Sequence, residues 1–412
     1  MRQTESRDVR AGIRVIFGVV VILLAYGSLY PFDFVASGPL WPAVQRVLQD
    51  WSTGESRGDI LGNVALFVPF GFFGLMNMRR APALTGAIAV LTLGTALALG
   101  LQLAQLFVVS RDAALHDVFW NVLGVLVGMA GVALPVVRRW SGGVGPDAPV
   151  ILPLTLIGGW FAAELLPLVP ALDLAALKES AKPLLLEHRF HVEPFLRAAV
   201  AWLGVACLLH ASVGPATRAL ILGIVALMGG KLLVVDQAVT LSDVAGAGLA
   251  ILLWIAGVRA VSGRNAAIGA AALGYLVYTG VTPLVLAETR TAFLWVPFQG
   301  YLEGEMLVNA AVLARKAFFM ATALYLLREA GLRLRHATPL VTAVLLSVEI
   351  VQVYTLGHTP AITDPILVLV IGGALWALLG PPVAADGSGE QERRDPHTRG
   401  RPVHPWRRSP SG

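Results

Sequence analysis

Long runs of hydrophobic residues alternate with short polar segments along almost the whole chain. Each run is about 20 residues long, the length that a helix needs to cross the hydrocarbon core of a bilayer. Such runs occur at residues 13–29, 60–77, 83–108, 117–137, 150–170, 195–212, 217–235, 243–261, 266–286, 305–327, 338–356 and 363–380. The pattern predicts an all-α fold, a polytopic membrane protein with about twelve transmembrane helices.

The composition agrees with a membrane protein. Of the 412 residues, 56% are hydrophobic and only 14% are charged, whereas about 25% of the residues in a typical soluble domain are charged. So few charges could not cover the surface of a soluble protein of this length. The single cysteine, Cys207, lies inside an expected span, so an intramolecular disulfide is excluded.

The distribution of basic residues predicts the orientation of the chain. With the N-terminus inside, the inner connections and the C-terminal segment hold 20 arginines, and the opposite connections hold seven arginines and lysines. Cytoplasmic connections carry such an excess, so both termini are expected in the cytoplasm. Residues 382–412 are polar, basic and rich in Pro and Gly, which predicts a disordered basic cytoplasmic tail.

One short pattern occurs three times. The stretch "RDAALHDVFWNVLGVLVGMAGV" aligns without gaps to "QAVTLSDVAGAGLAILLWIAGV" and to "HTPAITDPILVLVIGGALWALL". The alignment superimposes Asp117, Asp243 and Asp364, which are 126 and 121 residues apart. Each interval holds about four of the expected spans, so the chain reads as three four-helix units.

An even number of helices in each unit keeps all three units in one orientation, so we expect parallel repeats rather than inverted ones. The expected boundaries are 1–140 for unit 1, 150–263 for unit 2, 266–381 for unit 3 and 382–412 for the tail.

Further positions align between the units, but not in all three of them. Units 1 and 3 pair Asp59 with Glu305, Asn63 with Asn309, Gln102 with Glu349, and Gln105 with Gln352. Unit 2 has Met228 and Lys231 at the last two positions and retains little beyond Asp243. A Pro-Phe pair also precedes the second expected helix of each unit, at Pro31, Pro194 and Pro297.

The repeated polar residues predict a polar cluster near the outer surface in units 1 and 3. Asp117 and Asn121 are four residues apart, and Gln102 and Gln105 are three apart, so each pair shares a helix face. Polar side chains in a span normally face the bundle interior, because facing lipid costs a few kcal/mol each. The candidate ligand-binding residues are Asn63, Gln102, Gln105, Arg111, Asp117, Asn121, Asn309, Arg315, Glu349, Gln352 and Asp364.

Structural roles compete with this interpretation. Aspartate is a preferred N-cap, and Asp364 followed by Pro365 reads as an N-cap with proline at the first helical position. The glutamines could tie helices together by interhelical hydrogen bonds. Glu349 lies deep in a span, where a carboxyl group must be neutral or paired.

Three cations also fall inside expected spans and need partners. Lys231 has Asp236 and Asp243 as candidate partners, and Arg315 and Lys316 have Glu349. Structural ion pairs and an anion site explain these cations equally well.

Other chemistry finds no support in the sequence. No spacing of His and Cys resembles a zinc site, so no metal is expected. The chain has no nucleophile elbow, P-loop or dinucleotide-binding fingerprint. We therefore expect no cofactor and no nucleic-acid partner, and the catalytic residues of any enzymatic activity are unknown.

Unit 1 resembles the VanZ-like family. The resemblance rests on "YPFDF" (30–34), "DILGNVALFVPFGFF" (59–73) and "LQLAQLFVVSRDAALHDVFWNVLGVLVG" (101–128), in the family's order. It is clear in residues 30–128, looser in 296–380 and weak in between. Unit 1 departs from the family by having Gln102 where an acid is usual. The family is named for a teicoplanin-resistance protein, so the resemblance implies a bacterial inner-membrane protein with a cell-envelope role and no assigned mechanism.

Three functions fit these observations. The first is binding or handling of an amphiphilic or lipid-linked envelope molecule through outward-facing polar pockets, with a role in glycopeptide-antibiotic resistance among the options. The second is a membrane enzyme that acts on an isoprenoid or phospholipid head group. The third is a secondary transporter, although transporters typically carry broken helices and binding sites at the bilayer midplane. We expect the bilayer as a partner, and the sequence does not predict the oligomeric state.

Overall fold

The computed structural model describes most of the expected helical region. It covers residues 2–35, 41, 44–45, 57–78, 81–111, 113–132, 148–167, 169–171, 173–187, 189–214, 217–303 and 306–379. Glu305 and the expected tail at 382–412 lie outside the described residues, as do several of the arginines on which the expected orientation rests.

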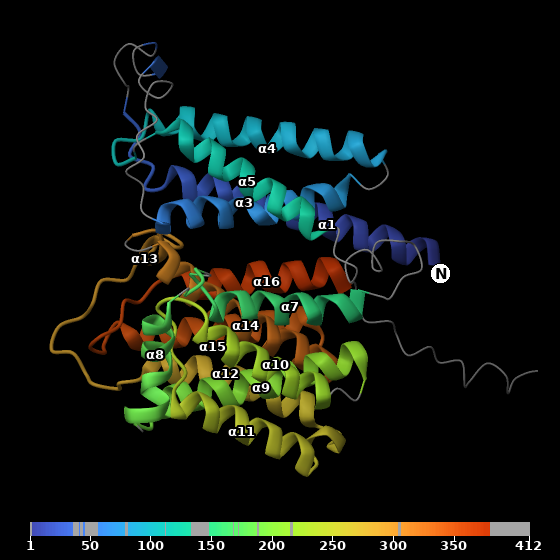
Figure 1. Ribbon diagram of the computed structural model, residues 1–412, viewed down its shortest axis with the longest axis vertical. Coiled ribbons are helices and arrows are strands. Elements are labelled where there is room, and N and C mark those ends of the chain that lie inside the picture. The colour runs from blue at the N-terminus through green and yellow to red at the C-terminus, as the bar shows by residue number, and fades with distance from the viewer. Residues whose placement is uncertain are drawn as a thin grey trace, which may run out of the picture. The chain divides into compact units, whose positions relative to one another are not determined.

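A long helix is present in each of the twelve ranges where a span is expected. These are α1 (Arg2–Leu29), α3 (Arg57–Asn77), α4 (Ala83–Gln105), α5 (Leu115–Gly131), α7 (Ala148–Glu164), α9 (Val192–Val213), α10 (Thr217–Leu232), α11 (Leu241–Ala256), α12 (Arg264–Val281), α14 (Met306–Glu329), α15 (Leu334–Gln352) and α16 (Thr363–Leu379) (Figure 1). We call α1–α5 the N-terminal region, α7–α11 the middle region and α12–α16 the C-terminal region.

The connections contain shorter elements. These are α8 (Leu174–Lys182), a π-helical turn (Pro183–Glu187), a 3₁₀ turn (Val258–Ala260) and α13 (Gln299–Leu302). No β-strand occurs among the described residues, which form isolated β-bridges only. The described part of the chain is all-helical, as the sequence predicts.

Within the described residues, six helical segments are long and apolar enough to cross a membrane. They are Ala11–Leu29, Gly58–Asn77, Ala83–Gln105, Val192–Val213, Val308–Glu329 and Leu334–Gln352. The helices α5, α11 and α16 are apolar but shorter, with 17, 16 and 17 residues. The protein is a multi-pass helical membrane protein, and the crossing of the membrane by all twelve helices stays a prediction.

The N-terminal region has a hydrophobic core of its own, to which α1, α3, α4 and α5 all contribute. Within it α3 and α5 pack closely because glycines face the partner backbone. A Cβ atom added at Gly124 or Gly128 would collide with the carbonyl oxygens of Val64 and Val68. Small residues four positions apart commonly let two membrane helices approach in this way.

The middle and C-terminal regions share a second core. It runs from Trp160 of α7 and Trp202 of α9 to Phe318 and Tyr325 of α14, and α10, α11, α12, α15 and α16 also contribute to it. The helices expected of units 2 and 3 therefore bury their apolar faces together rather than in two separate cores.

An isolated antiparallel bridge recurs once in each region. Each bridge joins the segment after the first long helix to the segment after the third: Phe34 with Val108, Pro170 with Val234, and Leu286 with Thr355. The second partners are 126 and 121 residues apart, which are also the intervals between Asp117, Asp243 and Asp364. This recurrence supports the expected repeat, which stays a prediction.

The bridges also correct one alignment. A proline lies three residues before the first bridge residue each time, at Pro31, Pro167 and Pro283. The expected match of Pro31 with Pro194 and Pro297 is therefore wrong. Pro194 lies inside α9 instead.

The starts of α5, α11 and α16, which carry Asp117, Asp243 and Asp364, lie on the same side of the helix bundle. Tyr26, near the end of α1, donates a hydrogen bond to the carbonyl of Pro297 (2.7 Å). The next residue, Phe298, donates its N–H to Oγ1 of Thr363 at the start of α16 (2.8 Å). Tyr275, near the end of α12, donates to Glu193 at the start of α9 (2.7 Å). Parallel units require this arrangement, and the orientation in the membrane stays a prediction.

Candidate functional site

In the N-terminal region, three of the predicted residues meet in one cluster. Asp117 accepts hydrogen bonds from the side-chain amides of Asn63 (2.7 Å) and Gln102 (3.1 Å). The oxygen of Gln102 accepts the backbone N–H of Ala114, just before α5 (3.0 Å). The cluster therefore joins α3, α4 and α5 through groups that satisfy one another.

Gln105 and Arg111 belong to a neighbouring arrangement at the end of α1. Gln105 donates to the carbonyl of Ser28 (2.8 Å), and Arg111 donates to those of Tyr30 (2.9 Å) and Gly27 (3.3 Å). The last carbonyls of a helix have no intrahelical partner, and few waters are available in a membrane to satisfy them. Both side chains therefore act as C-terminal caps of α1.

Tyr30 connects this end of α1 to the C-terminal region. Its hydroxyl donates a hydrogen bond to Glu303 (2.8 Å). Burial, with a smaller effect of the Glu303 hydrogen bond, raises the pKa of Tyr30 to about 12. Tyr30 therefore remains a hydrogen-bond donor over the physiological pH range.

In the C-terminal region, the polar groups pair differently from the prediction. Lys316 of α14 forms an ion pair with Asp364 (2.7 Å), so the expected pairing of Lys316 with Glu349 is wrong. Glu349 instead accepts the backbone N–H of Ala361 (2.7 Å). The Lys316 ammonium group also lies over the ring of Tyr301 (5.8 Å to the centroid), and burial raises the pKa of Tyr301.

Gln352 and Asn309 donate hydrogen bonds to backbone carbonyls. Gln352 donates to the carbonyl of Gly280 in the last turn of α12 (2.9 Å), as Gln105 does for α1. Asn309 donates to the carbonyls of Tyr301 (3.2 Å) and Glu303 (2.8 Å). The contacts thus do not support the expected equivalence of Asn309 with Asn63, since Lys316 is the α14 residue that reaches the aspartate.

The aspartates are not N-caps, so that alternative also needs correction. The N-caps of α5 and α11 are Ala114 and Thr240, which places Asp117 and Asp243 at the third helical position. Asp243 completes a capping box there: its backbone N–H donates to Thr240 Oγ1 (3.1 Å), and its carboxylate accepts the Thr240 N–H (3.3 Å). The carboxylate of Asp364 is occupied by Lys316 instead.

The middle region holds buried ion pairs that the sequence analysis missed. Lys231 pairs with Glu164 at the end of α7 (2.7 Å), so its expected pairing with Asp236 or Asp243 is wrong. The residues Lys231 and Glu164 are only 5% and 4% exposed. Asp243 pairs with Arg197 of α9 instead (3.2 Å). Arg315 of α14 is half-buried.

A small cavity of about 10 Å³ lies among these charges. The four paired residues, Glu164, Arg197, Lys231 and Asp243, all line it together with Trp160. Two buried atoms of its lining have no hydrogen-bond partner among the described residues, Nε1 of Trp160 and Oε1 of Glu164. The same is true of Oδ1 of Asn121 in α5, away from this cavity.

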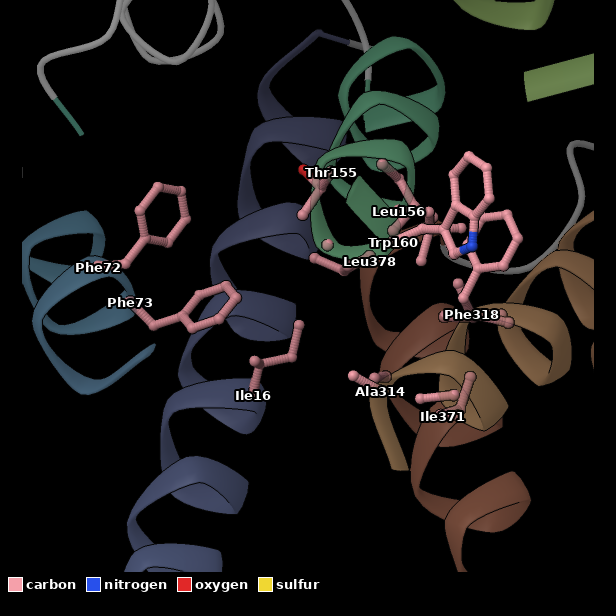
Figure 2. Close-up of a pocket in the computed structure, with 16 residues that line it drawn as sticks. Ile16, Phe72, Phe73, Thr155, Leu156, Trp160, Ala314, Phe318, Ile371 and Leu378 are labelled. Atoms are coloured by element: carbon pink, nitrogen blue, oxygen red, sulfur yellow. The ribbon is translucent and has the colours of Figure 1, made fainter. Parts of the chain in front are cut away.

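A second, larger cavity of about 380 Å³ lies between the N-terminal region and the shared core. Figure 2 shows Ile16 and Phe73 on one side of it and Trp160, Phe318 and Ile371 on the other. The lining residues of α1, α3 and α14 fall within candidate membrane spans. Apart from Thr155 and Trp160, its lining side chains carry no polar atoms, so the cavity suits an apolar group.

The VanZ/LLP1 family model matches residues 12–136, which include α1, α3, α4 and α5. Residues 12–136 therefore form a VanZ-like domain. No curated protein and no solved structure matches the chain.

The VanZ-like domain contains the Asn63–Gln102–Asp117 cluster and one wall of the large cavity. The ion pairs of the middle region lie outside the matched residues, as does the looser resemblance in 296–380, which stays a prediction. A sequence signal for the missed pairs did exist. Glu164 and Arg197 each interrupt an apolar run near one end, as Lys231 does.

Proposed function

We propose that this VanZ-like membrane protein binds an amphiphilic or lipid-linked molecule of the cell envelope. The observation that supports this proposal best is the apolar cavity of about 380 Å³ between the VanZ-like domain and the shared core. An apolar chain of the bound molecule would lie in this cavity. The bacterial inner membrane, with both termini in the cytoplasm, is the proposed location.

The properties of the cavity fit an acyl or isoprenoid chain. Its volume lies within the range of about 300–1,000 Å³ that is usual for ligand pockets, and such pockets are mostly apolar. On α7, its lining extends from Leu152 to Trp160, a helical rise of about 12 Å. Thr155 and Gly159 in this stretch are exposed, so the α7 side offers a route of entry from the surrounding lipid.

The polar clusters favour binding over catalysis. Asp117, Asp364 and Glu349 each have a dedicated structural partner on a neighbouring element. A carboxyl group that acts as acid or base must reach its substrate, whereas these groups hold helices together. We therefore place ligand recognition in the apolar cavity rather than in the outward polar pockets.

Photolabelling tests the proposal. The full chain would be reconstituted in lipid nanodiscs with a phosphatidylglycerol that carries a diazirine on one acyl chain. After irradiation, we expect the label on peptides of α7, α14 and α16 that line the cavity. The variant Ala317→Phe, which places a bulky ring in the cavity, should reduce that labelling at least about fivefold, since well-packed space does not admit a second group without strain.

The matched control is Ala310→Phe, an exposed position of the same helix that does not line the cavity. Its labelling of the cavity peptides should equal that of the unmodified protein. Equal labelling in all three proteins would contradict the proposal. The same variants expressed in a glycopeptide-sensitive bacterium would show whether an occupied cavity changes teicoplanin susceptibility.

A further inference from the structure

The two cavities have one lining residue in common. Trp160 lines both the large apolar cavity and the small charged one. Its indole is only 3% exposed and stacks on Phe318 of α14, with ring centroids 5.2 Å apart. Trp160 therefore forms the partition between a space that suits an apolar chain and a space lined by polar groups.

A donor and an acceptor without partners lie at this partition. The Nε1–H of Trp160 can only donate a hydrogen bond, and Oε1 of ionised Glu164 can only accept one. The two residues are four positions apart on α7 and so share a helix face. A buried group left without a partner is unfavourable, so a ligand that satisfied both atoms would be bound preferentially.

The charges around the small cavity restrict the chemistry of such a ligand. Lys231 is paired with Glu164 and Arg197 with Asp243, so the four charges that line the small cavity cancel, and neither of its lining cations is free to pair with an anion. A carboxylate has no hydrogen to donate to Glu164, and an ammonium group has no lone pair to accept from Trp160. A hydroxyl group both donates and accepts, and a space of about one water molecule, such as this one of about 10 Å³, admits its oxygen.

We propose that the preferred ligand is a lipid alcohol, whose apolar chain lies in the large cavity and whose hydroxyl group bridges Trp160 Nε1 and Glu164 Oε1. This inference rests on the proposed function and names the polar end of the molecule that the cavity accepts. The hydroxyl accepts from the indole N–H and donates to the carboxylate. No charge is moved into the interior.

Displacement of the photolabel tests the inference. Decanol, decyl methyl ether, decanoic acid and decane would compete with the diazirine lipid for the unmodified protein in nanodiscs, with each concentration corrected for partition into empty nanodiscs. We expect decanol to displace the label at a concentration about tenfold lower than the ether, which cannot donate to Glu164, or the hydrocarbon. Decanoic acid at neutral pH should not surpass the hydrocarbon.

The variant Trp160→Phe keeps the aromatic partition and removes the donor. It should bring decanol close to decane in potency and leave decane unchanged, while Trp254→Phe, at a buried tryptophan that lines neither cavity, should retain the tenfold preference. The four competing probes tested on the unmodified protein decide whether a hydroxyl group is preferred, even if the variant does not fold.

The outcomes separate this inference from the proposed function. Equal displacement by all four probes would overturn the lipid alcohol and leave the apolar binding site standing. Preference for decanoic acid would also overturn it, since an anion would then be the ligand. Equal potency of decanol and its ether would overturn it as well, because the hydrogen bond donated to Glu164 would then contribute nothing to binding. Absence of any cavity labelling would overturn the proposed function itself.

Discussion

The first long helix of the VanZ-like domain, α1, and that of the middle region, α7, each receive a side-chain contact near their last residue. The contact is a neutral hydrogen bond in α1 and an ion pair in α7. In the VanZ-like domain, Gln105 donates to the backbone carbonyl of Ser28. In the middle region, Lys231 occupies the equivalent position and pairs with the side chain of Glu164. Ser28 and Glu164 both lie three residues before the proline that follows the helix.

The C-terminal region uses the same neutral contact as the VanZ-like domain. Gln352 donates to the carbonyl of Gly280, which again lies three residues before a proline. An amide can satisfy a carbonyl without introducing charge, whereas a lysine in the same place needs a carboxylate because an isolated buried charge is costly. The comparison shows that all three regions retain a contact at the end of the first long helix. Where the donor is a lysine instead of a glutamine, the acceptor is a carboxylate instead of a backbone carbonyl.

The largest expected effect is that of breaking the ion pair. Lys231→Met removes the cation and leaves Glu164 as an uncompensated buried carboxylate. We expect the free energy of unfolding to fall by about 3–5 kcal/mol. Equilibrium unfolding of the purified protein in mixed micelles would measure it.

The double variant Lys231→Met with Glu164→Leu provides the control, because it removes both charges. It should recover most of the lost stability, since an apolar pair often replaces a buried ion pair at little cost. A double variant no more stable than Lys231→Met would contradict the expectation that the loss comes from the unpaired Glu164 carboxylate.

The next effect concerns the carboxylate of the VanZ-like domain. Asn63→Leu removes the 2.7 Å hydrogen bond to Asp117 and leaves the Gln102 amide in place. We expect a loss of about 1.5–3 kcal/mol in the free energy of unfolding, because hydrogen bonds to charged groups are the stronger ones.

The same change in an Asp117→Leu background serves as its reference. There, Asn63→Leu should cost much less, because the acceptor is already absent. An equal cost in both backgrounds would show that Asn63 stabilises the fold in some other way.

A smaller effect is expected at the capping box of the middle region. Thr240→Val removes the hydroxyl that accepts the Asp243 N–H and donates to its carboxylate (2.7 Å). Loss of an N-cap costs about 0.5–2 kcal/mol. Helical content by circular dichroism during thermal unfolding would register the change.

Thr279→Val is a matched control for this substitution. The Thr279 hydroxyl donates to the carbonyl of Tyr275 in its own helix, which already has a backbone partner available. The melting temperature should hardly change. A drop as large as that of Thr240→Val would mean that the capping box has no special role.

The smallest effect should come from the amide caps. Gln105→Leu leaves the carbonyl of Ser28 without its side-chain donor, and we expect a loss of about 0.5–1.5 kcal/mol. Gln352→Leu should behave alike because it makes the same contact with Gly280. If either loss approached that of Lys231→Met, the distinction between amide and charged caps would fail.

Much of the helical organisation could be predicted from the sequence because a membrane imposes a simple rule on it. A span of about 20 apolar residues must satisfy its own backbone, so it must be a helix. The similar intervals between Asp117, Asp243 and Asp364 likewise predicted that they would occupy comparable places, and the bridges at Val108, Val234 and Thr355 recur at those intervals.

The partners of the polar residues were predicted less well. For Lys231, acids five and twelve residues away were nearer in sequence than Glu164, which is 67 residues away. For Lys316, Glu349 was a nearer choice than Asp364. Sequence distance says little in a bundle, because helices far apart along the chain lie side by side.

The sequence by itself determined that this is a helical membrane protein, where its helices lie and that its N-terminal part is VanZ-like, because hydrophobic length and local motifs are properties of short segments. Only the tertiary structure decided which acid neutralises which base, which carbonyls the glutamines cap and that Trp160 lines both cavities. Those contacts depend on the rotation and depth of each helix against its neighbours, and no single segment carries that information.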